Sequence, residues 1–186
     1  MNAKQIAAKN SKMTQQRLDW RKKFWPEVDE NGLWDRKDRT RCNGFTTMPR
    51  TMPNIMGIID SLTKGKPSSP TYLVLWCRVT DEMVIRIQNP IYLAAESGFS
   101  HQRQVTTWEN RMKSLVELGF IKATAGQAGP YEFVLVMNPY LVIYALHEKE
   151  QIPVSLYNAL QLRAMEIGAK DLEIAEKKEE AAAGLE

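Results

Sequence analysis

The chain has 186 residues, of which 44% are hydrophobic and 25% are charged, a balance typical of soluble globular proteins. No apolar run approaches the roughly 18 residues that span a bilayer, and the N-terminus lacks the apolar core of a signal peptide, so we expect a cytoplasmic protein without membrane contact. Two cysteines and two histidines show no metal-ligand spacing, and no phosphate-binding loop or nucleophile motif is present. These patterns predict a protein that is not an enzyme and needs no metal or cofactor.

The net charge of +3 is unevenly distributed along the chain. Residues 1–50 carry +6, residues 51–147 carry +1, and residues 148–186 carry −4. We accordingly predict a basic, partly irregular N-terminal arm, a central domain, and a C-terminal helix with an acidic tail over these three ranges. The basic arm suits contact with phosphates, but it equally describes a solvated terminus.

Residues 1–24 are polar and poor in apolar periodicity, which fits either a frayed helix or disorder. Three aromatic side chains follow among basic residues: Trp25, Trp34 and Phe45 beside Arg36, Lys37, Arg39 and Arg41. These residues could contact nucleic acid. Aromatic side chains in irregular segments more often fasten the segment to a core, and we favour that interpretation.

The central domain begins with a helix that Thr51 is expected to cap and that Gly65 is expected to end. Its apolar residues recur at helical spacing: Met52, Ile55, Ile59 and Leu62. Residues 71–79 fit a helix or a buried strand by pattern alone, and their place in the chain favours a helix. Residues 83–87 are β-branched and predict a short strand.

A second pair of helices follows, over residues 91–97 and 101–118. Gly98 permits the tight turn between them, and Ser100 is a suitable N-cap for the second helix. The expected buried stripe of that helix is Val105, Trp108, Met112, Leu115 and Val116. Strands over 120–124 and 131–137 are expected around the sequence AGQAGP, whose glycines and proline predict a mobile turn.

The remainder of the chain is predicted to be helical. Residues 140–147 are apolar and are expected to pack on the preceding unit. After Pro153, a helical stripe ends near Gly168, and its members are Leu156, Leu160, Ala164 and Ile167. The tail from Lys170 is predicted to be either a solvated helix or disordered.

The order helix, strand, helix, helix, strand, strand over residues 71–137 resembles the winged-helix DNA-binding family. The matching residues are Leu93, Ala94, Gly98, Val105, Trp108, Leu115, Gly119 and Ile121. In the tightest helix-turn-helix pattern the apolar pair would fall on Gln104 and Thr107, so the turn here is one residue longer. The resemblance implies a mainly α fold with a small β-hairpin (α+β), a winged helix-turn-helix with N-terminal and C-terminal helical extensions.

The outward face of helix 101–118 carries side chains that suit base and phosphate contacts. Arg103, Thr106, Thr107 and Asn110 follow one helical stripe, and a solvated face would usually carry more Glu and Lys. Ser100 and His101 are expected at the helix N-terminus, where backbone N–H groups favour phosphate. The predicted DNA-binding residues are Ser100, Gln102, Arg103, Thr106, Thr107, Asn110, Arg111, Lys122 and Gln127.

These residues predict sequence-specific binding of double-stranded DNA, with a homodimer through the C-terminal helix. The run VLVMNPY (134–140) looks like the end of the winged-helix domain in some plasmid replication initiators. A transcriptional regulator or a replication initiator of a plasmid or mobile element is therefore expected. The alternative is a protein–protein interaction module on a winged-helix scaffold, which the near-neutral central domain and acidic tail also fit.

Overall fold

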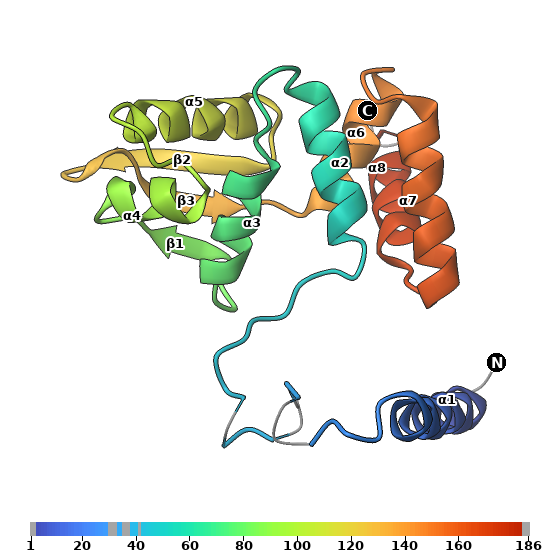
Figure 1. Cartoon of the computed structure of the whole chain (residues 1–186). Coiled ribbons are helices and arrows are strands. Elements are labelled where there is room, and N and C mark those ends of the chain that lie inside the picture. The colour runs from blue at the N-terminus through green and yellow to red at the C-terminus, as the bar shows by residue number, and fades with distance from the viewer. Residues whose placement is uncertain (1–2, 30–32, 35–37, 41, 184–186) are drawn as a thin grey trace. The chain divides into compact units, whose positions relative to one another are not determined.

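A computed structural model describes residues 3–29, 33–34, 38–40 and 42–183, with side chains described from residue 12 to residue 177 of these ranges. The chain divides into two compact units, Met1–Phe45 and Thr46–Glu186 (Figure 1). Three of the basic side chains considered for nucleic-acid contact, Arg36, Lys37 and Arg41, lie outside the described residues.

The first unit consists of helix α1 (Ala3–Phe24) and a following segment whose described residues form turns and irregular chain. Trp25 and Trp34 are 56% and 63% exposed. These two indole rings are therefore not buried within the described part of the first unit. Phe45 is half-buried, and the guanidinium carbon of Arg39 lies 4.1 Å from the centre of its ring.

The second unit contains ten elements along residues 46–186 (Figure 1). They are α2 (Met52–Leu62), α3 (Ser69–Arg78), β1 (Val84–Arg86), α4 (Pro90–Glu96), α5 (Gln104–Glu117), β2 (Ile121–Gly126), β3 (Gly129–Val136), α6 (Pro139–Glu148), α7 (Val154–Ile167) and α8 (Asp171–Ala183). The described chain thus has eight helices and one three-stranded antiparallel sheet, which confirms the predicted α+β class. None of these helices combines the length and the apolar character needed to cross a membrane.

The sheet has the order β1-β3-β2, so the short strand before α4 pairs with the second strand of the hairpin. Ile85 of β1 pairs with Val134 of β3, and both side chains are buried. The neighbouring row of Val84, Leu135 and Lys122 is exposed on the other face. One face of the sheet therefore closes the core under the helices, and the other faces solvent.

Large buried side chains join α3, α5 and the sheet. Tyr72 of α3 is fully buried, and its ring meets that of Phe120 edge-on at 5.5 Å between centroids. Trp108 of α5 is 1% exposed and meets the ring of Tyr131 edge-on at 5.8 Å. Burial of these rings is the main attachment of α5 to the strands.

The buried stripe of α5 is narrower than predicted. Trp108, Met112 and Leu115 are buried, whereas Val105 is half-buried and Val116 is 38% exposed. The three buried residues are spaced by four and three positions, which places them on one line of the helix. Val116 follows Leu115 by one residue and therefore lies about 100° away from this line around the helix. It is exposed, so the prediction that it is buried is wrong.

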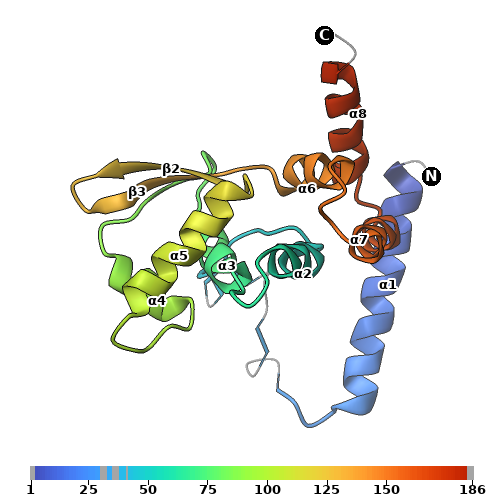
Figure 2. The ribbon, with the colours of Figure 1, turned by 90° about the horizontal axis from the view of Figure 1, so that it is seen from above.

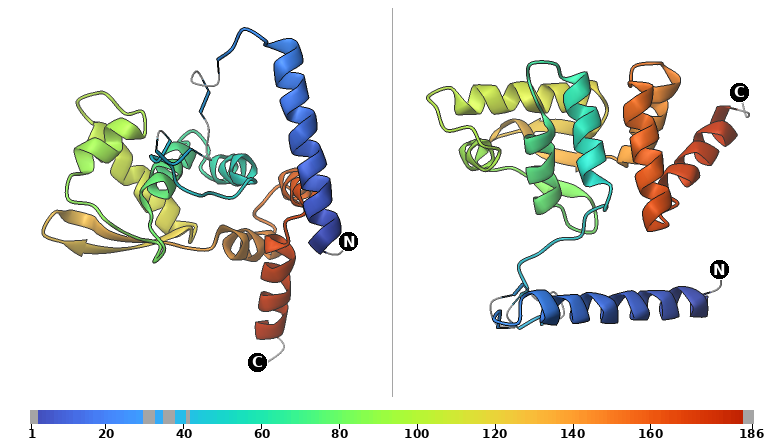
Figure 3. Two further views of the ribbon diagram at one scale, coloured as in Figure 1. Left: turned by 90° about the horizontal axis from the view of Figure 1, so that it is seen from below. Right: turned by 45° about the vertical axis from the view of Figure 1, so that its right-hand side comes forward.

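The C-terminal helices pack within the second unit, α7 against α2 and α8 against α6 (Figure 3). Leu160 and Ala164 of α7 are buried as predicted, and α7 ends at Gly168 in a left-handed conformation with φ of +67°. Of the tail, residues Asp171–Ala183 form helix α8, which fits the helical alternative of the prediction. Leu172 of α8 is buried, and Glu176 accepts a 2.8 Å hydrogen bond from the hydroxyl of Tyr157.

Thr51 occupies the predicted N-cap position of α2, but its side chain makes no capping hydrogen bond. Its hydroxyl oxygen instead lies 2.7 Å from the hydroxyl oxygen of Tyr140 at the start of α6. The two side chains are 0% and 5% exposed, and burial raises the pKa of the Tyr140 phenol. This buried hydrogen bond joins segments that are 89 residues apart.

We expect Thr51→Val to lower the free energy of unfolding by about 1–3 kcal/mol, because it leaves the buried Tyr140 hydroxyl without a partner. Urea unfolding followed by circular dichroism measures the change. The double variant Thr51→Val/Tyr140→Phe removes both polar groups and should recover part of the loss. Equal stability of Thr51→Val and the wild type would show that the hydrogen bond contributes nothing.

Candidate nucleic-acid interface

Helix α4 is fixed by local hydrogen bonds and by its packing on α5. The side chain of Asn89 accepts a 3.2 Å hydrogen bond from the N–H of Ile91 and so caps the helix at the predicted Asn-Pro. Leu93 and Ala94 are buried. Gly98 follows with φ of +87°, a conformation that L side chains rarely adopt, and reverses the chain toward α5.

The chain between Gly98 and α5 forms a longer turn than the sequence predicted. The helix begins at Gln104, with Arg103 in the N-cap position, so the prediction that Ser100 caps it is wrong. The N–H of Phe99 donates to the carbonyl of Ala94, and His101 Nδ1 accepts a 3.2 Å hydrogen bond from the N–H of Arg103. The half-buried Phe99 in this turn packs against the hydrophobic core.

This shift changes where the predicted contact residues lie. Ser100 and Gln102 are exposed in the turn, four and two residues before the first residue of α5. Arg103 is exposed at the N-cap. Arg103 stands at the N-cap, where its carbonyl accepts a 2.9 Å hydrogen bond from the N–H of Thr107. Of the four residues in the predicted stripe, only Thr106, Thr107 and Asn110 thus lie within α5.

Within α5 the exposed line is Thr106, Asn110, Lys113 and Glu117. Lys113 and Glu117 form an ion pair at 3.8 Å between side chains that are both more than 60% exposed, as on an ordinary solvated surface. Thr106 and Asn110 occupy the N-terminal half of this line and carry no charge. The polar, uncharged half of the exposed face is thus the half nearest the turn.

Two predicted contact residues are less accessible. Thr107 is half-buried beside Trp108. Arg111 is also half-buried, and its guanidinium carbon lies 5.7 Å from the centre of the Phe99 ring. Its Nε atom is buried and has no hydrogen-bond partner in the described part of the chain. The guanidinium of Arg111 therefore packs against the turn before α5.

The hairpin is longer and tighter than predicted. Strands β2 and β3 extend to Gly126 and from Gly129, so that only Gln127 and Ala128 remain at the tip. The expected six-residue turn at AGQAGP is therefore wrong in length. The register shifts between Thr124 and Gly126, and such a bulge strengthens the local twist and redirects side chains.

The tip is tied down by one buried carboxylate. Glu132 is 4% exposed, and it accepts hydrogen bonds from the N–H of Ala128 at 2.8 Å and from Nε of Arg86 at 2.9 Å. A Cβ atom at Gly126 would lie too close to this carboxylate, so a larger residue there would require the Glu132 side chain to move. The Ala128 N–H, and after it the Arg86 guanidinium, holds the pKa of Glu132 below its ordinary value of 4.5.

A lowered pKa in the folded state predicts a pH-dependent contribution to stability. Above pH 4.5 the ionised Glu132 should stabilise the folded protein, and this contribution should disappear as the pH falls through the lowered pKa. Glu132→Gln lacks the titrating group. We therefore expect wild type to be more stable than this variant at pH 7, with a difference that shrinks in acid.

Urea unfolding of both proteins at pH 7 and at several values below pH 5 measures this difference. A difference in unfolding free energy that stays constant across this pH range would contradict the lowered pKa of Glu132. The difference can change with pH only if Glu132 is protonated at different pH values in the folded and the unfolded protein.

The structure brings some predicted contact residues together and separates others. In Figures 1 and 2 the hairpin tip, α4 and the turn into α5 lie at the same end of the second unit. Gln127 at the tip and Gln102 and Arg103 in the turn are exposed at this end. Lys122 lies near the other end of β2, in the exposed row with Leu135, on the sheet face that does not pack on α5. Lys122 therefore does not extend the surface formed by α5 and the tip.

The sequence did not point to two exposed side chains on α4. Ile91 and Tyr92 are 50% and 64% exposed. Leu93 and Ala94 face the inner side of this short helix, which leaves Ile91 and Tyr92 on its outer side. They could serve a partner that approaches α4 and the turn together.

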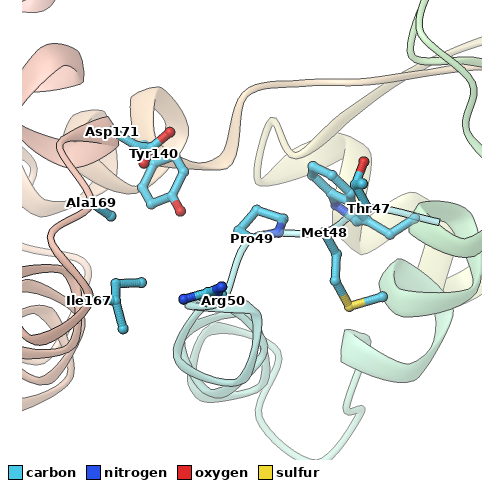
Figure 4. A pocket seen from close by; sticks show the side chains of 9 residues that line it. Thr47, Met48, Pro49, Arg50, Tyr140, Ile167, Ala169 and Asp171 are labelled. Atoms are coloured by element: carbon cyan, nitrogen blue, oxygen red, sulfur yellow. The ribbon is translucent and has the colours of Figure 1, made fainter. Parts of the chain in front are cut away.

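A hollow of about 460 Å³ lies elsewhere in the second unit, between residues 47–50 and the turn that joins α7 to α8 (Figure 4). Pro49 and Tyr140 form parts of its opposite walls, and Arg50 and Asp171 contribute charges of opposite sign. No residue of α5 or of the hairpin lines it. It is therefore separate from the candidate interface.

Among the residues that the structure describes, no three His, Cys, Asp or Glu side chains gather closely enough to hold a metal ion. The geometry of α4, α5 and the hairpin tip is instead that of a polar surface around one helix end. Comparisons of the chain with protein-family models, with curated proteins and with solved structures returned no match.

Proposed function

We propose that this protein binds double-stranded DNA in a sequence-specific manner, with residues 71–137 acting as a winged helix-turn-helix. One observation carries the proposal: the polar end of α5, the turn before it and the tip of the β2–β3 hairpin face the same end of the unit. The element order and the pairing of β1 with β3 fit that family resemblance. In this arrangement a helix enters the major groove and a hairpin contacts the adjacent backbone.

The roles follow from the exposure of each side chain. Thr106 and Asn110 are the exposed polar residues of α5, and an Asn side chain can make two hydrogen bonds to adenine N6 and N7. Arg103 at the N-cap and Gln127 at the hairpin tip are placed for contact with the phosphate backbone on either side. The basic first unit adds affinity through counterion release.

Fluorescence anisotropy with a random-sequence duplex at 50 and 200 mM salt tests the proposal. We expect micromolar binding at the lower salt, weakened roughly fortyfold at the higher salt if three phosphates are contacted. Absence of binding at 50 mM salt would contradict it.

The proposed biological role is that of a transcriptional regulator or of a replication initiator of a plasmid or mobile element, and it rests on the resemblance of residues 134–140. A homodimer through the C-terminal helices would supply two half-sites. The outward side of α7 supports this part of the proposal, because Val154, Leu162 and Met165 are 63%, 67% and 71% exposed there. Light scattering during size-exclusion chromatography measures the dimer.

A protein–protein interaction module is the second candidate function. Its supporting observation is the solvent face of the sheet, where Val84, Phe133 and Leu135 are 48%, 40% and 37% exposed in adjacent strands. An exposed apolar patch of this kind often marks a protein interface. DNA binding that is absent or independent of salt would favour this alternative.

A further inference from the structure

The first unit exposes an unusual set of flat aromatic rings. Trp20, Phe24 and Trp25 are 49%, 58% and 56% exposed, and the rings of Phe24 and Trp25 meet edge-on at 6.0 Å between centroids. Trp20 and Phe24 lie four positions apart in α1 and so share one line of the helix. The unit therefore presents adjacent ring faces to solvent at the C-terminal end of α1.

Cations surround these rings. Between residues 12 and 28 the chain has five Lys and Arg residues and two carboxylates. Arg17 lies three positions before Trp20, on the same line of α1, and Lys23 Nζ lies 5.4 Å from the centre of the Phe24 ring. We call Arg17, Trp20, Lys23, Phe24 and Trp25 the aromatic–basic surface.

A hollow of about 300 Å³ adjoins this surface at the end of α1. Arg21, Lys22, Trp25, Pro26 and Val28 line it. It combines an aromatic ring with two cationic side chains, which are the groups that hold a base and its phosphate.

We propose that the aromatic–basic surface binds single-stranded nucleic acid. Unpaired bases would stack on Trp20, Phe24 and Trp25, while Arg17 and Lys23 would contact the phosphates together with Lys22 of the adjoining hollow. The site lies in the first unit and is distinct from the duplex-binding surface proposed for α5.

The exposed rings favour a single strand over a duplex. In a duplex the faces of the bases are already stacked on each other, so a flat ring gains contact only by separating them, at a cost of a few kcal/mol per step. A single strand offers its base faces directly. Phosphate contacts alone would need the cations but not three neighbouring aromatic rings.

The pattern of α1 also argues against a lipid surface as the occupant. A helix that lies in a membrane interface has a broad apolar face with its charges on the opposite side. Here Arg17 lies between Met13 and Trp20 on the aromatic line, and Leu18 lies on another side of the helix. The apolar face is therefore narrow and is interrupted by a charge.

The test titrates the full chain into a fluorescein-labelled oligothymidylate of about 20 nucleotides at 50 mM salt, with anisotropy as the readout. We expect micromolar binding, and Trp20→Ala/Trp25→Ala should weaken it at least about thirtyfold, since two stacked bases would be lost and each contributes about 1–3 kcal/mol. Trp20→Phe keeps a ring and should retain most of the affinity. Phe133→Ala is the matched control, because it removes a 40% exposed aromatic ring of the second unit that lies outside both proposed nucleic-acid surfaces.

Tryptophan fluorescence gives an independent readout. Trp20, Trp25 and Trp34 are exposed, whereas Trp76 and Trp108 are 9% and 1% exposed, so stacking should quench mainly the solvent-accessible emission. Loss of this quenching in Trp20→Ala/Trp25→Ala would support the assigned rings. Unchanged affinity in that variant would overturn the proposal, as would failure to bind the oligonucleotide, whether or not the chain binds phosphatidylglycerol vesicles.

The duplex and single-strand proposals can fail separately. Asn110→Ala should leave binding of the oligothymidylate unchanged, and Trp20→Ala should leave sequence preference on duplex DNA unchanged.

Discussion

Trp108→Ala should destabilise the second unit by about 3–5 kcal/mol, the largest loss of stability that we expect from a single substitution in α5. Trp108 is 1% exposed and packs on Tyr131 of β3, so its removal leaves a cavity between the helix and the hairpin. Neighbouring side chains cannot easily fill it, because Met112 and Leu115 are themselves fully buried. The substitution should therefore loosen the helix and the hairpin together.

Urea unfolding followed by far-ultraviolet circular dichroism measures this change without depending on tryptophan emission. Trp20→Ala is the matched control: its ring is 49% exposed in the first unit, and a surface substitution of this kind changes stability by about 0.5 kcal/mol or less. A loss below about 1 kcal/mol for Trp108→Ala would show that the core can close over the cavity.

Most helices and strands between Thr51 and Ile167 could be predicted from local sequence, because apolar spacing and the residues at helix ends determine them. The apolar spacing of α2, the Asn-Pro pairs before α4 and α6, and Gly168 after α7 each act within one or two turns of chain. The choice of helix for residues 71–79 was also correct, since α3 spans Ser69–Arg78.

The features that local sequence did not predict depend on distant contacts. Ser100 is a good N-cap by type, but α5 begins at Gln104, and Phe99 of the preceding turn meets Arg111 of the helix, twelve residues away, at 5.7 Å from ring centre to guanidinium carbon. Glu132, which accepts the N–H of Ala128 at the hairpin tip, is also hydrogen-bonded by Arg86, 46 residues away. No periodicity in either segment encodes such a pair.

The same distinction between local and distant determinants explains which residues of the candidate site were predicted correctly. Sequence spacing identified the exposed Thr106 and Asn110, whose positions depend only on the helical period. It misplaced Arg103, whose position depends on where the helix starts, and it grouped Lys122 with the tip although β2 places it on the other face of the sheet. The exposed rings of the first unit were missed because aromatic residues are usually buried.

Because α5 starts at Gln104, Arg103 lies at the N-cap and Asn110 lies within the helix, and we expect the two residues to contact different parts of the duplex. Asn110 is exposed on α5 itself, where it can hydrogen-bond a base edge, and it is uncharged. We expect Asn110→Ala to lose preference at one base pair, at a cost of about 1–3 kcal/mol, with an unchanged salt dependence. Arg103 precedes the helix, and we expect Arg103→Ala to weaken binding to all sequences and to reduce the salt slope by about one.

Selection of bound duplexes from a random pool, followed by anisotropy titrations over a range of salt concentrations, measures both properties for each variant. Gln151→Ala is the matched control, since it removes an exposed amide side chain between α6 and α7, outside both the proposed interface and the outward side of α7. If Asn110→Ala keeps the wild-type base preference and Arg103→Ala loses it, the base contacts come from the turn and not from the helix. If neither variant differs from wild type, α5 is not the DNA-binding helix, and the exposed apolar face of the sheet becomes the better candidate for the function of this unit.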